Sequence, residues 1–277
     1  MVLYIQVVIY NKKMSESATL STLSAQIREK NGGVRIILNI HDNSLFSCAN
    51  ADVFSKLSDS YEIQYVHTPE NNTLREIYNN AIENLNQEDI LLLLDDDTTL
   101  PTNYISSLLC DANVYKNVMV FSPKVIVNEK IYSPYKTYSF FSRPLNDISP
   151  GKIRSRRHAF INSGLAIRGK FFISSNFRYP EQVDFYGTDT VFSHFFNSHE
   201  KTYVLMNLTI FHDVNNHPEN KCAKSYANAL SKVIRFWLGY LHGISKVMYI
   251  LYITFYMLKM TVKFRNMIFI KTLMDLK

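Results

Sequence analysis

Residues 91–101, LLLLDDDTTLP, place three consecutive carboxylates directly after four leucines. A run of leucines is typical of a strand that is buried on both faces of a parallel sheet. Adjacent carboxylates repel one another unless a positive charge lies among them, and carboxylate oxygens are ligands that divalent cations prefer. The residue types therefore predict a metal site at Asp95 and Asp97, at the carboxyl end of a central strand.

Two enzyme classes use an acidic stretch of this kind. In the first, a D-x-D pair, Asp95 and Asp97, holds a metal that clamps the diphosphate of a nucleotide sugar as its glycosidic bond breaks. In the second, D-x-D-x-T-L is the nucleophile loop of haloacid dehalogenase-like phosphatases, and Asp95 is phosphorylated. A phosphatase of that kind carries its nucleophile on the first core strand, whereas three strands are predicted before Asp95. The strand order favours the first class.

The elements that must position these acids alternate between strand and helix. Apolar runs predict the strands, and apolar positions at helical spacing predict the helices. This alternation is typical of an α/β fold with a mostly parallel central sheet flanked by helices. The predicted strands are residues 3–9, 34–40, 61–66, 90–94, 118–121, 160–167 and 202–211, and the predicted helices begin near residues 17, 73, 102 and 186.

A further acid, Asp42, follows the second predicted strand within the turn DNS. Open α/β sheets bind ligands at the carboxyl ends of their strands. We therefore expect Asp42 and the triple aspartate to face one crevice. Residues 131–157 contain three prolines, many aromatic side chains and an arginine cluster, and they are predicted to form an irregular excursion over the site.

Charge divides the chain into two parts. Residues 221–277 contain ten Lys or Arg and one acid, which gives a net charge of +9. The whole chain has 30 basic and 24 acidic residues, so residues 1–220 contain 20 basic and 23 acidic residues and have a net charge of −3. We expect a catalytic domain over 1–220 and a basic amphipathic helical region over 221–277. The three cysteines lie far apart, as ordinary thiols of a reducing compartment do. The apolar start has no basic leader or cleavage site, so we expect no signal peptide.

The basic tail predicts attachment to an anionic membrane surface. Its longest uncharged run, residues 247–258, is twelve residues long, whereas spanning a bilayer takes about twenty. Basic and aromatic side chains on an amphipathic helix are typical of a helix that lies on the membrane. The alternative is a helical pair that packs on the sheet or on a second subunit in a homodimer. The negative charge of residues 1–220 argues against nucleic-acid binding.

The order of several segments resembles the family 2 glycosyltransferases with a GT-A fold (nucleotide-diphospho-sugar transferases), particularly the rhamnosyltransferase-like enzymes of bacterial surface polysaccharide assembly. These segments are Tyr10-Asn11, Asp42-Asn43-Ser44, Glu70-Asn71-Asn72, Asp95-Asp96-Asp97, Asn162-Ser163-Gly164, Tyr186-Gly187-Thr188-Asp189-Thr190 and Ile210-Phe211-His212-Asp213. The resemblance covers roughly residues 3–215. It implies a nucleotide-sugar donor, Mn²⁺ or Mg²⁺, and a glycan or lipid-diphosphate-linked saccharide acceptor in O-antigen or capsule assembly. It also implies a cytoplasmic enzyme, peripheral on the inner face of the cell membrane.

The resemblance assigns roles to single residues. It places Asp42 on the nucleoside base, Asp95 near the ribose and Arg75 near phosphate, although a glycine that the family has near Asn71 is missing here. The implied mechanism is inverting, with Asp189 as the catalytic base and Asp184 as its rival. The full implied sets are Tyr10, Asn11, Asp42, Asn72, Arg75, Asn79, Asp95 and Asp96 for the donor, and Asp97, Asp95 and His212 for the metal.

A protein with these segments could also bind nucleotide or glycan without turnover, as an assembly partner. The acid at position 189 favours an enzyme.

Overall fold

The computed structural model describes residues 1–27, 33–127, 129–212 and 222–275. Its centre is a ten-stranded mixed sheet in which eight strands follow the order β10-β13-β6-β12-β4-β1-β2-β3. Neighbours from β4 to β3 are parallel, whereas β12 is antiparallel to both β4 and β6. The strands are β1 (Val2–Ile9), β2 (Arg35–Asp42), β3 (Glu62–His67), β4 (Ile90–Asp95), β6 (Val120–Val127), β10 (Gly151–Arg154), β12 (Leu165–Arg168) and β13 (Thr202–His212), with β5 (Thr98–Thr99) on β13 and β7 (Lys130–Ser133) on β6.

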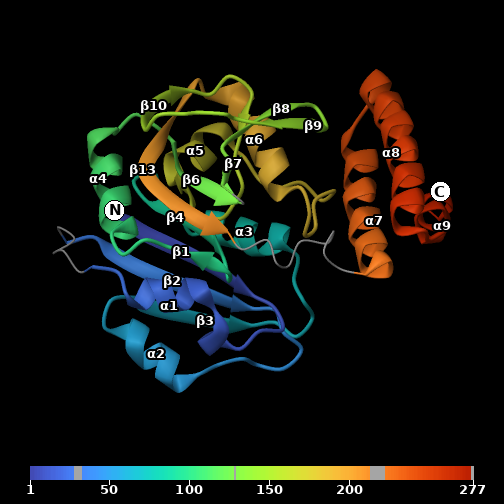
Figure 1. Cartoon of the computed structure of the whole chain (residues 1–277). Helices are drawn as coiled ribbons and strands as arrows, with labels where there is room; N and C mark the ends of the chain where they lie inside the picture. Colours follow the sequence, from blue (N-terminus) through green and yellow to red (C-terminus); the bar gives the residue numbers. More distant parts are fainter. Residues whose placement is uncertain (28–32, 128, 213–221, 276–277) are drawn as a thin grey trace.

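Helices cover the sheet on both faces (Figure 1). The best-defined start is that of α3, where the Thr73 hydroxyl accepts from the backbone N–H of Glu76 and the Glu76 carboxylate accepts from the backbone N–H of Thr73. This reciprocal capping satisfies two N–H groups that have no partner within the helix. The helices are α1 (Ala18–Ser24), α2 (Ala51–Ser58), α3 (Leu74–Glu83), α4 (Tyr104–Val114), α5 (Gly169–Ser175) and α6 (Thr188–His199), with the short 3-10 helix η1 (Met14–Glu16).

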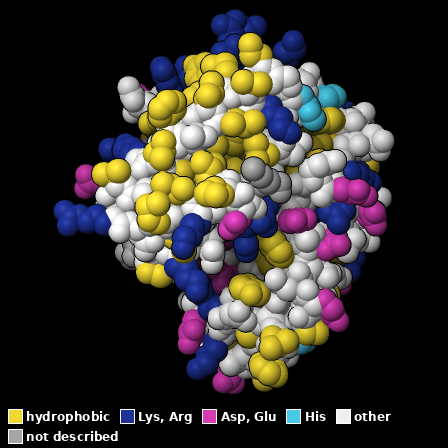
Figure 2. All heavy atoms as spheres, turned by 90° about the vertical axis from the view of Figure 1, so that its right-hand side faces the viewer, with side chains coloured by type: hydrophobic (Ala, Val, Ile, Leu, Met, Phe, Trp, Pro, Cys, Tyr) yellow, Lys and Arg dark blue, Asp and Glu magenta, His cyan; other side chains and the backbone are white. Residues whose placement is uncertain are grey.

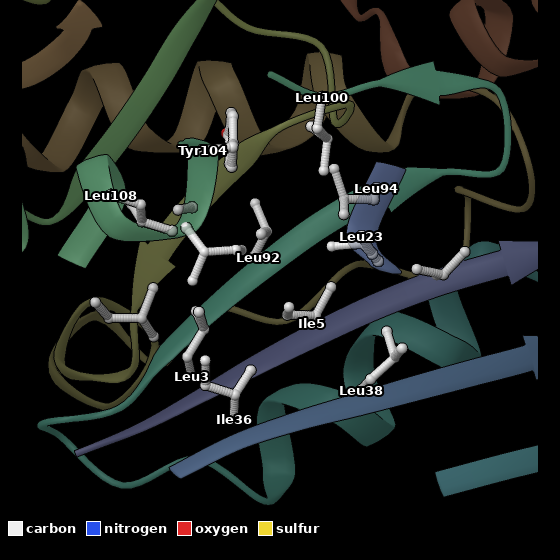
Figure 3. Close-up of a cluster of buried hydrophobic side chains, with 14 of the residues drawn as sticks. Leu3, Ile5, Leu23, Ile36, Leu38, Leu92, Leu94, Leu100, Tyr104 and Leu108 are labelled. Atoms are coloured by element: carbon white, nitrogen blue, oxygen red, sulfur yellow. The ribbon is translucent and has the colours of Figure 1, made fainter. Parts of the chain in front are cut away.

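The leucine run on β4 contributes to two separate cores. Leu92 and Leu94 pack in a cluster on one face of the sheet (Figure 3), and Leu91 and Leu93 pack in a second cluster on the other face. Alternation follows because successive side chains of a strand point to opposite faces. All four leucines are at most 1% exposed, so the prediction of a central strand that is buried on both faces is confirmed.

Two sequence predictions about residues 131–167 are wrong. The segment 131–157 is largely strand: β7 and β10 join the main sheet, and β8 (Tyr135–Tyr138) and β9 (Phe141–Pro144) pair in a second sheet with β11 (His158–Ala159). The strand predicted over 160–167 is confined to β12, because Gly164 adopts a φ of +84° and breaks the extended path. The sequence predicted a loop here because prolines lie next to these short strands.

The tail forms three helices, α7 (Ala223–Tyr240), α8 (Gly243–Phe264) and α9 (Ile268–Met274), which stand beside the sheet and share a core of their own (Figure 1). One residue of α7, Phe236, belongs to the second core of the main body. The boundary predicted between residues 220 and 221 falls among residues 213–221, outside the part of the chain that the structure describes.

Candidate active site

Three parallel strands end side by side at the predicted crevice. Asp42 at the end of β2 is in register with Ile9 of β1, and Asp95 at the end of β4 is in register with Val8 of β1. The segments that follow β1, β2 and β4 therefore meet at one edge of the sheet. This is the edge at which open α/β sheets bind ligands.

The Asp42 carboxylate organises the turn after β2. It is fully buried and accepts hydrogen bonds from the backbone N–H of Ser44 (2.9 Å), the backbone N–H of Cys48 (2.6 Å) and the hydroxyl of Tyr65 (2.6 Å). Burial by itself would raise the pKa of Asp42, but these donors together lower it below the usual range. The prediction that the Asp42 side chain faces the crevice is wrong, because its oxygens accept hydrogen bonds from the turn and from Tyr65. Its contact with a nucleoside base stays a prediction.

Tyr10 and Asn11 lie at the open rim of this edge. Tyr10 is 56% exposed, and Asn11 has a left-handed φ of +50°. The backbone N–H of Asn11 donates to the hydroxyl of Ser44 at 2.8 Å, which ties the end of β1 to the turn after β2. The backbone that carries the exposed Tyr10 side chain is therefore held beside the crevice.

The three consecutive aspartates have three different surroundings. Asp95 accepts a hydrogen bond from the Ser163 hydroxyl, and Asp96 pairs with Lys12 at 3.0 Å. Asp97 is half-buried. Burial raises the pKa of Asp96, Lys12 opposes this, and the charges of Asp97 and Asp95 raise it further. The sequence did not reveal Lys12 or the bond from Ser163, because these contacts join segments far apart in the chain.

Asp189 is the second residue of α6 and follows Gly187, whose φ is +86°. Its carboxylate accepts from the backbone N–H of Thr190 at 2.7 Å. Burial raises the pKa of Asp189 to about 6, and the charge of Asp95 acts in the same direction. Burial, followed by the charges of Asp95, Tyr179 and Asp189, also raises the pKa of the fully buried Tyr78 hydroxyl well above its ordinary value. The structure thus brings Asp95 and Asp189 close enough for their charges to interact, although 93 residues separate them in the sequence.

A cavity of about 510 Å³ opens beside Asp189. Burial raises the pKa values of its two tyrosines, Tyr132 and Tyr135, and the charge of Asp189 adds to this effect. The sequence did not identify these tyrosines as site residues, because they lie in the segment predicted to form an irregular excursion. The cavity is lined by Val127, Lys130, Ile131, Tyr132, Tyr135, Ser142, Pro144, Ile161 and Asp189.

Three residues predicted to bind the donor have structural contacts. Asn79 exchanges two hydrogen bonds with the backbone of Tyr179, at 3.0 and 2.9 Å, and thereby clamps α3 to the segment before α6. Arg75 pairs with Glu76 at 3.3 Å, and Asn72 accepts from the Asn43 side chain through its backbone carbonyl. The rival base, Asp184, has an exposed side chain, and its backbone carbonyl accepts from the N–H of Arg75.

The metal site predicted at Asp97, Asp95 and His212 stays a prediction. His212 pairs through its backbone with Thr98, the residue after Asp97, but its side chain lies outside the described part of the structure. Among the described residues, no three His, Cys, Asp or Glu side chains form a group that could hold a metal. The donor chemistry nevertheless fits Mg²⁺ or Mn²⁺, because such ions use one or two carboxylates and complete their shell with water and substrate phosphate.

The chain has the GT-A fold of nucleotide-sugar glycosyltransferases. It is similar to S. aureus TarS 1–349 in complex with UDP (TM-score 0.54, 12% identity, 96% of this chain and 71% of that one) and to TarS 1–349 alone (0.53, 13%, 86% and 66%). It is also similar to GalNAc-T7 with UDP, GalNAc and Mn²⁺ (0.57, 14%, 76% and 44%).

These similarities extend over part of each solved structure. The chain spans 66% and 71% of the two TarS 1–349 structures and 44% of GalNAc-T7. No family model matches the sequence, and no curated protein matches it. At these low identities the likeness shows the fold, and the activity has to be argued from the residues at the edge of the sheet.

Proposed function

We propose that this protein is an inverting glycosyltransferase that moves a sugar from a nucleoside-diphosphate donor to a saccharide acceptor. The observation that carries the proposal is the position of Asp189, which lines a cavity and lies close enough to Asp95 for the Asp95 charge to raise its pKa. Two carboxylates on opposite sides of a reacting sugar can take two different roles. The GT-A fold argues against the phosphatase alternative, in which Asp95 would be the nucleophile.

Asp189 is proposed as the general base. A pKa of about 6 leaves its carboxyl mostly ionised at neutral pH yet basic enough to accept a proton, which is the condition for efficient base catalysis. The acceptor hydroxyl in the cavity would lose its proton to Asp189, and its oxygen would bond to the anomeric carbon. The bond from that carbon to the diphosphate would break, and the nucleoside diphosphate would leave from the opposite face. Asp184 is the weaker candidate, because its exposed side chain does not line the cavity.

Asp97 and Asp95 are proposed to hold Mn²⁺ or Mg²⁺, with His212 as a further ligand. The field at this site supports a cation, since the charges of Asp95 and Asp97 raise the pKa of Asp96, and Asp95 does the same to Asp189 and Tyr78. When bound, such an ion stabilises the charge that develops on the diphosphate leaving group. Lys12 pairs with Asp96, and the Ser163 hydroxyl donates to Asp95.

The proposed donor is a uridine diphosphate sugar, because the solved structures with this fold include complexes with UDP and UDP-GlcNAc. The exposed Tyr10 ring at the rim of the crevice is suited to stack on a nucleoside base. The proposed acceptor is a glycan or lipid-diphosphate-linked saccharide in the assembly of a bacterial O-antigen or capsule. Such an acceptor would place the enzyme on the cytoplasmic face of the cell membrane.

The test measures thermal stabilisation of the full chain by UDP, GDP, dTDP, CMP and AMP, each with and without Mn²⁺. A ligand at 100 times its Kd stabilises the folded state by about 2.7 kcal/mol, which for a chain of this size is a shift of several degrees in Tm. We expect a shift with UDP that requires Mn²⁺ and is lost in Asp97→Asn, with the exposed Asp147→Asn as the matched control. If no nucleotide raises the Tm, the proposal is wrong.

A further inference from the structure

The outer face of α8 carries a continuous stripe of exposed apolar side chains. Figure 2 shows hydrophobic side chains gathered on this side of the molecule, with lysine and arginine around them. The spacing of three and four residues keeps the stripe on one face along the length of the helix. Its members and their exposed fractions are Ile244 (79%), Val247 (57%), Met248 (54%), Leu251 (58%), Phe255 (72%), Leu258 (44%) and Val262 (77%).

The opposite face of α8 is already packed. Tyr249, Ile253, Met257 and Met260 are at most 5% exposed and form a core with residues of α7 and α9. The exposed stripe therefore cannot turn inward without opening this core. Something other than the rest of this fold must cover it, because soluble proteins seldom leave an apolar patch of this extent in water.

Charge identifies what covers the stripe. Residues 222–275 contain eight Lys or Arg and one acid, Asp275. Lys259 and Lys263 lie on the exposed surface of α8 itself, beside the stripe. A second copy of this chain would bring the same positive charge to the contact, whereas an anionic lipid surface is complementary to it. Apolar side chains flanked by lysines fit a helix that lies in the headgroup region.

By length and composition α8 could also cross a bilayer. The packing argues against this arrangement, because α8 would have to leave α7 and α9. Its lysines also divide the uncharged run well short of the roughly twenty residues that a span requires.

An aromatic cluster connects α8 to the cavity beside Asp189. Phe140 lies 5.1 Å from Tyr249, and Phe141 lies 5.1 Å from Tyr252, measured between ring centroids. These phenylalanines belong to the β8–β9 hairpin, and Ser142 of the same hairpin lines the cavity. One hairpin thus contacts both α8 and the proposed acceptor cavity.

We infer that the exposed stripe of α8 binds an anionic lipid surface and holds the cavity beside Asp189 next to that surface. The second part of this inference rests on the proposed function, because it takes the cavity as the site for a lipid-linked saccharide. The first part is independent of catalysis.

The experiment is flotation of the full chain with vesicles of phosphatidylglycerol and phosphatidylcholine, and with pure phosphatidylcholine, without donor or acceptor. We expect flotation with the anionic vesicles, at least tenfold weaker binding to the neutral ones, and release by high salt or alkaline carbonate. Leu251→Glu/Phe255→Glu should lose binding at least tenfold. Val114→Glu, a 65% exposed position on α4 away from the tail, should bind as the wild type does.

A second pair of variants tests the charge if the apolar double variant fails to fold. Lys259→Glu/Lys263→Glu should weaken anionic binding roughly tenfold or more. Lys116→Glu/Lys170→Glu changes the net charge equally at exposed positions of the main body and should have little effect.

Three results would overturn the inference. The first is equal binding of all variants, and the second is protein that resists carbonate extraction, as a spanning helix does. The third is a wild-type dimer that Leu251→Glu/Phe255→Glu converts to a monomer while no vesicle is bound. Failure of the proposed function gives a different result. A protein that floats with vesicles but binds no nucleotide would contradict the proposed transferase activity and would still support lipid binding by α8.

Discussion

The turn after β2 and the first turn of α6 each carry an aspartate with a shifted pKa, and the two shifts have opposite directions. Asp42 receives three hydrogen bonds that more than offset the effect of burial, so its pKa is lowered. Asp189 receives fewer donors and lies in the field of Asp95, so burial prevails and its pKa rises to about 6. The hydrogen bonds of Asp42 stabilise its ionised form and hold the turn together. The ionised form of Asp189 is less favourable, so this carboxylate is better suited to take up a proton.

The largest effect is expected from Asp189→Asn. It should lower the transfer rate roughly 10²–10⁴-fold, the usual contribution of a general base, while Mn²⁺-dependent stabilisation by UDP remains. Asp184→Asn is the matched control and should change the rate less than threefold. Steady-state kinetics with both variants measures this, and a larger loss in Asp184→Asn would transfer the catalytic role to Asp184.

Asp42→Asn should act mainly on stability. An amide cannot accept all three hydrogen bonds of the turn, and its NH₂ group would face a donor, so the free energy of unfolding should fall by about 2–3 kcal/mol. Denaturant unfolding measures the change, with the exposed Asp147→Asn as the control. Since the pKa of Asp42 is lowered in the folded state, its contribution should be full at neutral pH and lost as the pH falls through that pKa. An unchanged free energy of unfolding would show that the turn does not depend on the carboxylate.

Asp189 should impose the opposite dependence on pH. Its folded pKa is raised, so the stability linked to its neutral form is full below about pH 4 and is lost as the pH rises through about 6. Asp189→Asn should therefore be more stable than the wild type at pH 8, by on the order of 2 kcal/mol, and the difference should vanish at low pH. The wild-type kcat/KM should rise through about pH 6, and a flat profile over this range would contradict the base assignment.

The smallest effect is expected from Ser163→Ala. Loss of the hydroxyl that donates to Asp95 should raise the Mn²⁺ concentration needed for half of the UDP stabilisation by roughly 3–10-fold. Titration of Mn²⁺ at constant UDP measures this change. Ser198→Ala, at an exposed position of α6, should leave the titration unchanged. Equal titrations for both variants would remove Ser163 from the site.

The sequence predicted best where one local pattern determines the structure. The leucines at 91–94 specify a strand buried on both faces, and the acids that follow it must then lie at the edge of the sheet. The prediction failed where short strands are interrupted by prolines, as in residues 131–157. There, β10 pairs with the distant β13, whereas β7, β8 and β9 are four-residue strands of the short hairpins β6–β7 and β8–β9 and give too little local periodicity to be recognised.

Within the site, the sequence could identify acids but not their surroundings. It found Asp189 by resemblance, yet the raised pKa depends on burial and on Asp95, which only the folded chain brings near. It predicted that Asp42 faces the crevice because a strand end precedes it, yet the carboxylate is occupied by two backbone N–H groups of its own turn and by the Tyr65 hydroxyl of β3. Ser163 lies in a segment that carries the resemblance, but its bond to Asp95 had no local signal, and Lys12 had none at all.

The contact between Gly187 and Phe236 makes the tail a structural support of the segment that carries Asp189, the proposed base. A Cβ atom at position 187 would lie 2.4 Å from the Phe236 ring of α7, so the ring takes the space that a side chain would need. A chain shortened before α7 would therefore expose the turn that leads into Asp189, so loss of the tail should disturb the proposed active site as well as the proposed lipid contact. Exchange of tails between homologous chains would succeed only if the glycine and the aromatic ring were transferred together.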